Sequence, residues 1–196
     1  MNSAKIKKVP AQKMLCESDR VLPNFVLIGF MGCGKSSIGR RLAALTGHRF
    51  VDTDDQIVQS EGRSIVEIFA SEGEEHFREL EKRTVENLVG VCGIILSCGG
   101  GLILRQENRE NVKKIGIVAW LDADPDILFE RASRSGKRPL LQTENPRQTL
   151  DRLLDMRREF YTAAADFRLD STALSHDEAA QRLLDEALRF SHRFDG

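Results

Sequence analysis

This 196-residue chain has almost no net charge and no long apolar run. The 29 basic and 30 acidic residues leave a formal net charge of −1, which gives no support to a nucleic-acid-binding or membrane-surface protein. Apolar runs are too short to span a bilayer, and no apolar signal-peptide core precedes a cleavage site. We therefore expect a cytoplasmic protein with neither nucleic-acid nor membrane partners.

Cysteine and histidine are few, and they form no recognisable metal or disulfide pattern. None of the four cysteines belongs to a C-x-x-C pair, and the four histidines lack ligand spacing. We interpret the cysteines as reduced thiols and the histidines as non-catalytic. A Ser/His/Asp constellation for covalent catalysis is also missing. The cysteines are Cys16, Cys33, Cys92 and Cys98.

Residues 25–37 hold the strongest motif. Four apolar residues typical of a buried strand lead into the spacing G-x-x-x-x-G-K-S, and a helical pattern follows at once. Strand, glycine loop and helix are together the context of a P-loop. The alternative is a glycine-rich turn with an incidental lysine. From the first glycine the residues are Gly29, Phe30, Met31, Gly32, Cys33, Gly34, Lys35, Ser36 and Ser37.

Phosphate chemistry explains the residue types of this motif. Glycine tolerates backbone angles that a side chain forbids, so N–H groups converge on one anion beside the positive end of the following helix. Lys35 adds a charge for the β- and γ-phosphates, and the Ser36 hydroxyl is a ligand for Mg²⁺. Alone, the motif predicts a nucleotide with Mg²⁺ and suits an ATPase, a GTPase or a kinase.

An acidic turn, Asp52-Thr53-Asp54-Asp55, follows a short strand predicted at Phe50-Val51. In an open parallel sheet, ligands bind beyond the carboxyl ends of the strands. We therefore expect at least one of the three aspartates to be functional. The alternative is a solvated turn that caps the next helix, and one aspartate is expected to do only that.

Arg78 and a glycine triplet are the next candidates. Arg78 lies in an amphipathic helix predicted over 74–88, and a surface ion pair with Glu81 is the alternative to a functional role. Gly99-Gly100-Gly101 follows a strand predicted at 94–97, and successive glycines permit close approach of the backbone to a ligand. A loose turn is the alternative there.

Strands predicted at 115–121 and 167–169, with a helix at 150–165 and another from His176, complete an alternation of short strands and helices. Such an alternation predicts a parallel sheet that is covered on both faces. We expect one domain over residues 23–196.

Two polar segments stand outside this alternation. Residues 131–147 are basic and rich in helix breakers, which suits a lid that closes over phosphates, with a solvated basic loop as the alternative. Residues 1–22 are expected to be a mobile tail, with a docking arm as the minor reading.

From about Phe25 to Leu188 the sequence resembles the shikimate kinases, small P-loop kinases of the nucleoside-monophosphate-kinase type. The resemblance implies a three-layer α/β P-loop kinase fold, with a five-stranded parallel sheet flanked by helices and a mobile basic lid. The motifs that carry it are the P-loop, Asp52-Thr53-Asp54, Phe77-Arg78, Gly99-Gly100-Gly101, Arg138-Pro139-Leu140-Leu141, and Arg157 four residues before Tyr161.

The resemblance implies transfer of the ATP γ-phosphate to the 3-hydroxyl of shikimate, a step towards the aromatic amino acids, with Mg²⁺ as cofactor. It implies that Asp54 aligns the attacking hydroxyl, and that Arg78 and Arg157 bind the substrate carboxylate. Arg138 would reach the transferring phosphoryl group, and Asp52 would hold Mg²⁺ through water.

Further roles follow from the same resemblance. The implied catalytic residues are Lys35, Asp54 and Arg138. The implied ATP contacts are Gly29, Met31, Gly32, Cys33, Gly34, Lys35, Ser36, Ser37, Arg131 and Arg138. The implied substrate contacts are Asp54, Arg78, Gly99, Gly100, Gly101 and Arg157. The implied metal residues are Ser36 and Asp52.

Two other functions suit parts of the pattern. A related kinase acting on gluconate or another hydroxy-acid would use the same paired arginines. A catalytically silent nucleotide-binding regulator would keep the loop but not the acceptor-side residues, which are all present here. In either case we expect a monomer.

Overall fold

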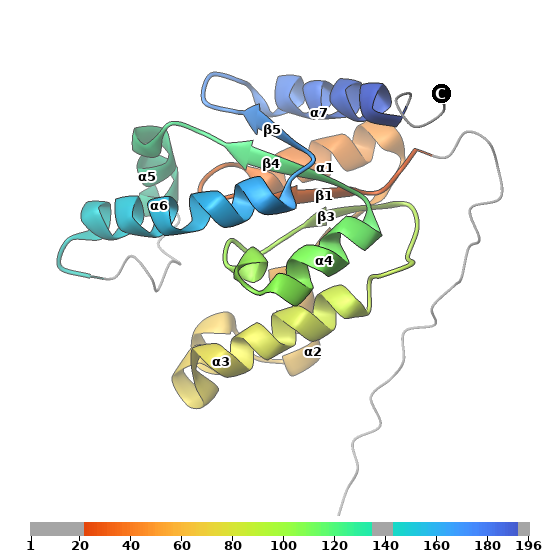
Figure 1. The fold of residues 1–196 in the computed structure, drawn as a ribbon. Coiled ribbons are helices and arrows are strands. Elements are labelled where there is room, and N and C mark those ends of the chain that lie inside the picture. The colour runs from red at the N-terminus through yellow and green to blue at the C-terminus, as the bar shows by residue number, and fades with distance from the viewer. Residues whose placement is uncertain (1–21, 135–142, 192–196) are drawn as a thin grey trace, which may run out of the picture.

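The structure of the chain is a computed structural model that describes residues 22–134 and 143–191 (Figure 1). The predicted tail at 1–22, apart from its last residue, lies outside the described residues, as does the predicted lid residue Arg138. Within the described ranges, no helix has both the length and the apolar character needed to cross a membrane.

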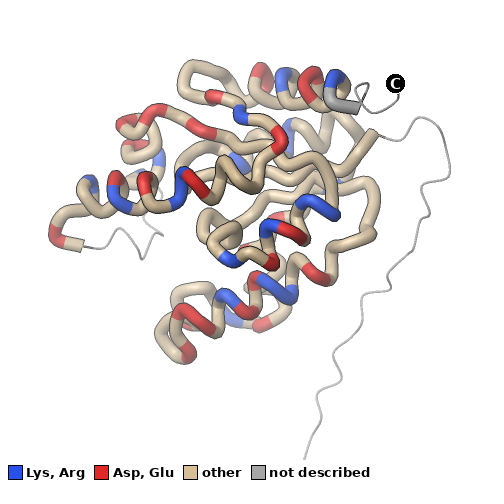
Figure 2. The backbone as a smooth tube through the Cα atoms, viewed as in Figure 1, with Lys and Arg blue, Asp and Glu red and all other residues tan. Residues whose placement is uncertain are grey.

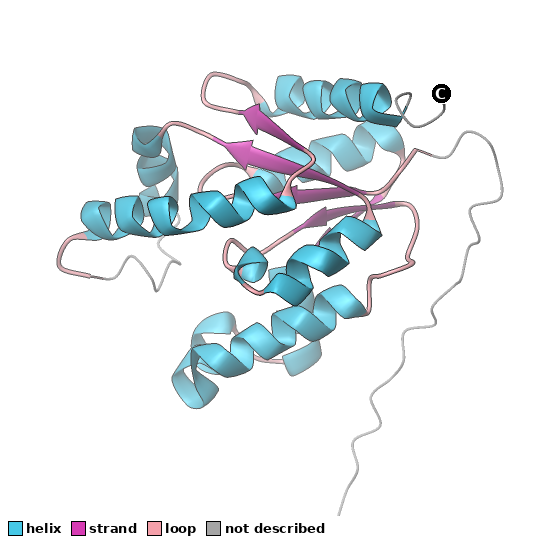
Figure 3. Cartoon of the chain, in the orientation of Figure 1, coloured by secondary structure: helices cyan, strands magenta, loops and turns pink. Residues whose placement is uncertain are grey.

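Five parallel strands form one sheet in the order β2-β3-β1-β4-β5 (Figure 3). Every residue of β1, β3 and β4 is buried, because helices cover both faces of the sheet, whereas the edge strands β2 and β5 are partly exposed. The predicted five-stranded parallel sheet is therefore confirmed. The strands are β1 (Phe25–Ile28), β2 (Arg49–Asp52), β3 (Ile94–Ser97), β4 (Ile117–Asp122) and β5 (Phe167–Asp170).

The helices complete a three-layer arrangement. Helices α1 and α7 pack together on one face of the sheet, and α4 and α6 pack on the other (Figure 1). Helices α2 and α3 pack against each other beside β2. The helices are α1 (Lys35–Thr46), α2 (Thr53–Glu61), α3 (Ile65–Glu86), the short 3-10 helix η1 (Leu102–Leu104), α4 (Gln106–Ile115), α5 (Pro125–Arg134), α6 (Pro146–Ala164) and α7 (His176–Ser191).

Charge is distributed over the helices and not over the centre of the sheet. Figure 2 shows both signs of charge along the helices, whereas β1 and β3 carry no charged residue. A second, smaller hydrophobic cluster joins α2 to α3 and consists of Ile57, Ile68, Phe77 and Leu80. The α2–α3 pair therefore has a core of its own, and Arg78 directly follows one of its members.

Predicted and observed boundaries differ in three places. The helix predicted over 74–88 is the second half of α3, which is interrupted by the non-helical Gly73 (φ 81°) and ends at Glu86, so the predicted start at 74 is confirmed and the predicted end is two residues too late. Helix α6 begins at Pro146 instead of Leu150, because proline suits the first turn of a helix as well as a loop. Since α5 extends to Arg134, both ends of the predicted lid at 131–147 are helical.

The Asn24 side chain ties three segments together at the amino-terminal edge of the sheet. Its amide nitrogen donates to the carbonyl oxygens of Val91 and Ile115, and its amide oxygen accepts from the N–H group of Ile94. These segments precede β1, β3 and β4 or run into them. The Asn24 side chain thus links the amino-terminal ends of these strands, opposite to the carboxyl ends where the predicted ligand residues lie.

Replacing Asn24 by alanine should therefore destabilise the fold. We expect Asn24→Ala to lower the free energy of unfolding by about 2–4 kcal/mol, because it leaves three buried or half-buried backbone groups without their partner. Urea denaturation measures this change. Asn87→Ala is the matched control, since Asn87 is exposed, and should change stability by less than about 0.5 kcal/mol. Equal effects in the two variants would contradict the prediction.

Candidate active site

The loop between β1 and α1 lies too close to its neighbours to carry side chains at two positions. A Cβ atom on Gly29, where φ is 144°, would lie 2.2 Å from the carbonyl oxygen of Leu121 at the end of β4. One on Gly32, where φ is 84°, would lie 2.7 Å from the carbonyl oxygen of Leu128 in α5. The loop is therefore clamped between β4 and α5, and only glycine permits this approach.

Lys35 is the first residue of α1, and its side chain folds back over the loop. Its ammonium group donates to the carbonyl oxygens of Gly29 (2.8 Å) and Phe30 (3.0 Å). The lysine charge is thus held against the loop at the start of a helix, where the helix dipole also favours an anion. The predicted contact of Lys35 with the β- and γ-phosphates stays a prediction.

Ser36 and Asp52 meet across the ends of α1 and β2. The Ser36 hydroxyl donates to Asp52 Oδ2 (2.9 Å), while Asp52 Oδ1 accepts from the N–H group of Asp54 and caps α2. Asp52 thus has the capping role that the sequence left open for this turn, and it also contacts the serine of the phosphate loop. Asp55 is exposed and lies 3.9 Å from Arg40 in a surface ion pair.

The Ser36–Asp52 pair offers hard oxygen ligands of the kind that Mg²⁺ prefers. In the described part of the chain, no group of three or more His, Cys, Asp and Glu residues is placed to hold a metal by itself. A Mg²⁺ ion at this point would take its other ligands from phosphate and water, as it usually does in phosphoryl-transfer sites. The residues present therefore fit this ion.

The glycine triplet lies directly against charged side chains from α2 and α3. A Cβ atom on Gly99 would lie 2.7 Å from Asp54 Oδ1 and 2.9 Å from Glu81 Oε1, and one on Gly101 would lie 2.6 Å from Arg78 Nη1. The Gly99 N–H group donates to the Thr53 hydroxyl (2.8 Å), which fixes the start of the turn. The triplet is therefore a packed element, and the loose-turn alternative does not hold.

Arg78 is buried, which overturns the surface ion pair that the sequence left open. Its guanidinium group donates to Glu81 Oε2 and to Glu74 Oε1, both at 2.7 Å. The pair with Glu81 exists, but the two side chains are only 10% and 1% exposed. A buried, doubly hydrogen-bonded arginine beside a glycine turn is a fork that suits a planar carboxylate.

Glu81 is the site residue that sequence reasoning missed. Glu81 is one of several glutamates in this segment and did not stand out among them. The signal that could have found it is its spacing: it follows the buried Phe77 by four residues, which places both on the inner face of α3. Burial raises the pKa of Glu81 to about 7; the neighbouring Arg78 opposes this rise, and the charge of Asp54 adds to it. The site therefore holds a carboxyl group that titrates near neutral pH.

Arg157 enters the site from α6, and only 5% of it is exposed. Its guanidinium carbon lies 5.6 Å from the centre of the Phe30 ring in the loop. A Cβ atom on Gly100 would lie 3.7 Å from Arg157 Nη1 and 3.6 Å from the carbonyl oxygen of Gly29. Arg157 therefore lies where the phosphate loop meets the glycine triplet.

The other described side chains predicted to bind the nucleotide are Arg131, Met31, Cys33 and Ser37. Arg131 lies half-buried on α5, the helix that clamps Gly32, but no hydrogen bond or ion pair links its side chain to another described residue. Met31 and Cys33 are buried in the loop, and Ser37 is exposed on α1. Their predicted contacts with a nucleotide are not tested by this geometry.

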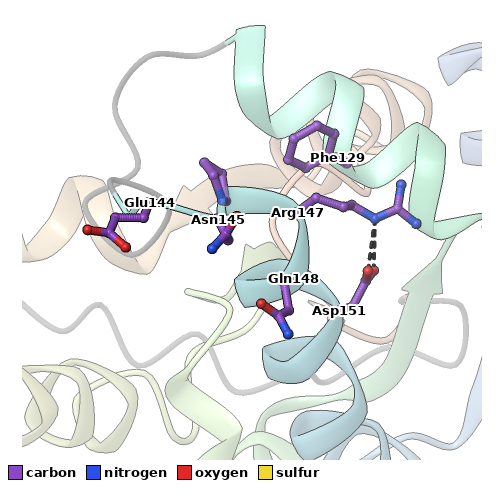
Figure 4. A pocket seen from close by; sticks show the side chains of 7 residues that line it. Phe129, Glu144, Asn145, Arg147, Gln148 and Asp151 are labelled. Atoms are coloured by element: carbon purple, nitrogen blue, oxygen red, sulfur yellow. Dashed lines mark hydrogen bonds and ion pairs between the residues drawn. The ribbon is translucent and has the colours of Figure 1, made fainter.

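A hollow of about 390 Å³ lies between α5 and the start of α6. Figure 4 shows the Arg147 side chain directed at Asp151, one turn further along α6, and the Arg147 guanidinium carbon lies 5.7 Å from the centre of the Phe129 ring on α5. Among the described residues, none of those predicted to contact nucleotide or substrate lines this hollow. The phosphate loop, Asp52 and the glycine triplet lie instead at the carboxyl ends of β1, β2 and β3.

Comparison with known proteins agrees with this geometry. The family model for shikimate kinase matches residues 31–188. The chain belongs to the shikimate kinase family. It is accordingly a kinase, an enzyme that transfers a phosphoryl group.

Relatives match over most of their length. A shikimate kinase from Thermodesulfovibrio yellowstonii is 39% identical over 171 residues, which cover 87% of this chain and 98% of the relative. One from Actinobacillus pleuropneumoniae is 44% identical over 162 residues, which cover 83% of this chain and 94% of the relative.

Solved structures show the same fold. A shikimate kinase from Acinetobacter baumannii in complex with shikimate has a TM-score of 0.83 and 38% identity, covering 86% of this chain and 94% of that chain. A gluconokinase from Sinorhizobium meliloti has a TM-score of 0.57 at 19% identity, covering 89% of this chain and 97% of that chain. The second likeness is one of fold alone.

The raised pKa of Glu81 makes stability depend on pH. Between 4.5 and about 7, the folded chain keeps a proton that the unfolded chain loses. The contribution of this group is complete below the lower value and is lost as pH rises through the upper one, a change on the order of 3 kcal/mol. Urea denaturation at about pH 5 and about pH 8 should show Glu81→Gln gaining stability relative to the unsubstituted chain at the higher pH.

Glu74→Gln is the matched control, because Glu74 binds the same arginine but is 57% exposed. This variant should keep the pH dependence of the unsubstituted chain. If Glu81→Gln and the unsubstituted chain respond to pH in the same way, Glu81 does not carry the buried charge that we assign to it.

Proposed function

We propose that the chain transfers the γ-phosphoryl group of ATP to the 3-hydroxyl of shikimate. The observation that carries the proposal is that the phosphate loop and the predicted acceptor residues lie next to each other. The phosphate loop lies on one side of Gly100, and Asp54, Arg78 and Arg157 lie around the glycine triplet. The shikimate complex of the Acinetobacter baumannii relative supports the choice of acceptor.

The phosphate loop and α1 form the donor half. The N–H groups from Gly29 to Ser37 and the Lys35 ammonium group would bind the phosphates of ATP, and Arg131 would lie against the base. Ser36 would ligate Mg²⁺, with Asp52 holding it through water. When bound, the metal neutralises phosphate charge and orients the oxygens of the transferring group.

The residues around the triplet form the acceptor half. Arg78 and Arg157 would bind the substrate carboxylate, and Arg78 would exchange a contact with Glu74 or Glu81 for it. The N–H groups of Gly99, Gly100 and Gly101 are further donors to the substrate.

Phosphoryl transfer asks for positioning and charge neutralisation more than for covalent chemistry. Asp54 would align the 3-hydroxyl and receive its proton as the oxygen bonds to the γ-phosphorus. The bond from that phosphorus to the leaving oxygen of ADP breaks in the same step. Arg138 lies outside the described residues, and its part in this step stays a prediction.

Two alternatives carry less weight. The likeness to a gluconokinase is one of fold, so it does not favour gluconate as acceptor. A silent regulator has no need for two buried arginines at an acceptor position. We also propose that the protein is cytoplasmic and monomeric; the phosphate loop and the acceptor residues of a single chain already meet in one site.

An acceptor panel with ATP and Mg²⁺ tests this function. We expect turnover with shikimate and little with gluconate or a nucleoside monophosphate, measured by release of ADP. Lys35→Ala should lower kcat roughly 100- to 1000-fold, because a charge aimed at the transferring phosphate is lost. Lys114→Ala, an exposed lysine on α4, is the control and should keep full activity. Turnover with another acceptor but not with shikimate would refute the proposal.

Arg78→Ala separates the two halves of the site. It should weaken shikimate binding roughly 10- to 100-fold, which corresponds to the loss of a charge-assisted hydrogen bond, and should leave ATP binding nearly unchanged. Isothermal titration calorimetry measures both. Arg83→Ala, an exposed arginine on the same helix, should change neither. Loss of ATP affinity in Arg78→Ala would move this residue to the nucleotide side.

A further inference from the structure

Two buried hydroxyl groups donate hydrogen bonds to backbone carbonyl groups, one in the glycine triplet and one in the phosphate loop. The Tyr161 hydroxyl on α6 donates to the carbonyl oxygen of Gly100 (2.7 Å). The Ser171 hydroxyl, just after β5, donates to the carbonyl oxygen of Cys33 (3.2 Å). Neither residue has a role in the reaction described above.

The geometry of the peptide bond gives these contacts a functional meaning. The carbonyl oxygen of Gly100 and the N–H group of Gly101 belong to one planar, trans peptide and point in opposite directions. A partner that holds the Gly100 oxygen therefore also sets the direction of the Gly101 N–H group. The same argument connects the Cys33 oxygen to the N–H group of Gly34 in the phosphate loop.

Tyr161 is held firmly enough to act as such a partner. Its side chain is fully buried and stacks on the Trp120 ring, with 5.7 Å between ring centres. The Arg168 guanidinium lies over the same tryptophan and pairs with Asp122 at the end of β4. Burial also raises the pKa of the Tyr161 phenol above its ordinary value, and the nearby Arg157 opposes this rise.

Ser171 is anchored in the same way on β4. Its N–H group donates to the carbonyl oxygen of Asp122 (2.8 Å), and its hydroxyl oxygen lies 3.0 Å from the same carbonyl. A carbonyl oxygen can accept two hydrogen bonds, so the single hydroxyl hydrogen is shared between the Asp122 and Cys33 carbonyl oxygens and links the phosphate loop to the end of β4. Ser171 is 2% exposed, so water does not compete for this bond.

We propose that Tyr161 and Ser171 are positioning residues for the two halves of the site, in which the phenol orients the Gly101 N–H group towards the acceptor and the serine hydroxyl orients the Gly34 N–H group towards phosphate. The proposal rests on the proposed function for the identity of the two ligands. Each hydroxyl should therefore affect the binding of one ligand, whereas a purely structural role would affect both.

The test is a comparison of two variants, each of which is the control for the other. Tyr161→Phe keeps the ring and its stacking, and should raise the Kd and KM for shikimate roughly 3- to 10-fold while the Kd for ATP stays within about 2-fold. Ser171→Ala should show the reverse, with ATP weakened by a similar factor and shikimate unaffected. Calorimetry on the full chain and steady-state kinetics give these values.

Ser171→Thr should restore the affinity for ATP, because it brings the hydroxyl back. Equal weakening of both ligands in each variant, or no change in either ligand, would overturn the proposal. A Tyr161→Phe variant that does not fold would overturn its acceptor half, since the hydroxyl would then serve stability. If the unsubstituted chain does not bind shikimate, the proposed acceptor is wrong, and the ATP measurement on Ser171→Ala still decides the donor half.

Discussion

Bare peptide backbone, packed directly against neighbouring groups, holds the two loops of the site in place. A side chain on Gly29 would overlap the carbonyl group of Leu121, and one on Gly101 would overlap the guanidinium group of Arg78. Because glycine has no Cβ atom, the phosphate loop reaches the end of β4 and the triplet reaches α3. The distance between the donor and acceptor halves is set by these contacts, and every proposed ligand contact depends on it.

The order of the sheet explains why five separate segments meet at this point. In a parallel sheet all carboxyl ends lie on the same edge, and here each strand delivers one part of the site there. The phosphate loop follows β1, Asp52 ends β2, the glycine triplet follows β3, Asp122 ends β4, and Ser171 follows β5. The small core between α2 and α3 adds Arg78 and Glu81 from the side.

Charge inside the acceptor half is balanced. The buried Arg78 and Arg157 lie near the buried Glu81 and the half-buried Asp54, and Glu74 at the rim completes the hydrogen bonds of Arg78. Burying an unpaired charge costs several kcal/mol, so a compensated set is the arrangement that a folded chain tolerates. An incoming carboxylate would then exchange places with a carboxylate that is already there, instead of meeting an unsolvated arginine.

Local sequence determined the phosphate loop, the capping of α2 and the five strands, because these depend on residue spacing over a few positions. It did not determine that Glu81 is buried, that Arg147 lies in a helix, or which carbonyl groups Tyr161 and Ser171 contact. Burial and pKa depend on which helix lies opposite, and a hydroxyl is indistinguishable from any other until the carbonyl that it meets is known. Tyr161 and Gly100 are 61 positions apart, and Ser171 and Cys33 are 138 apart, so only the tertiary structure brings each pair together.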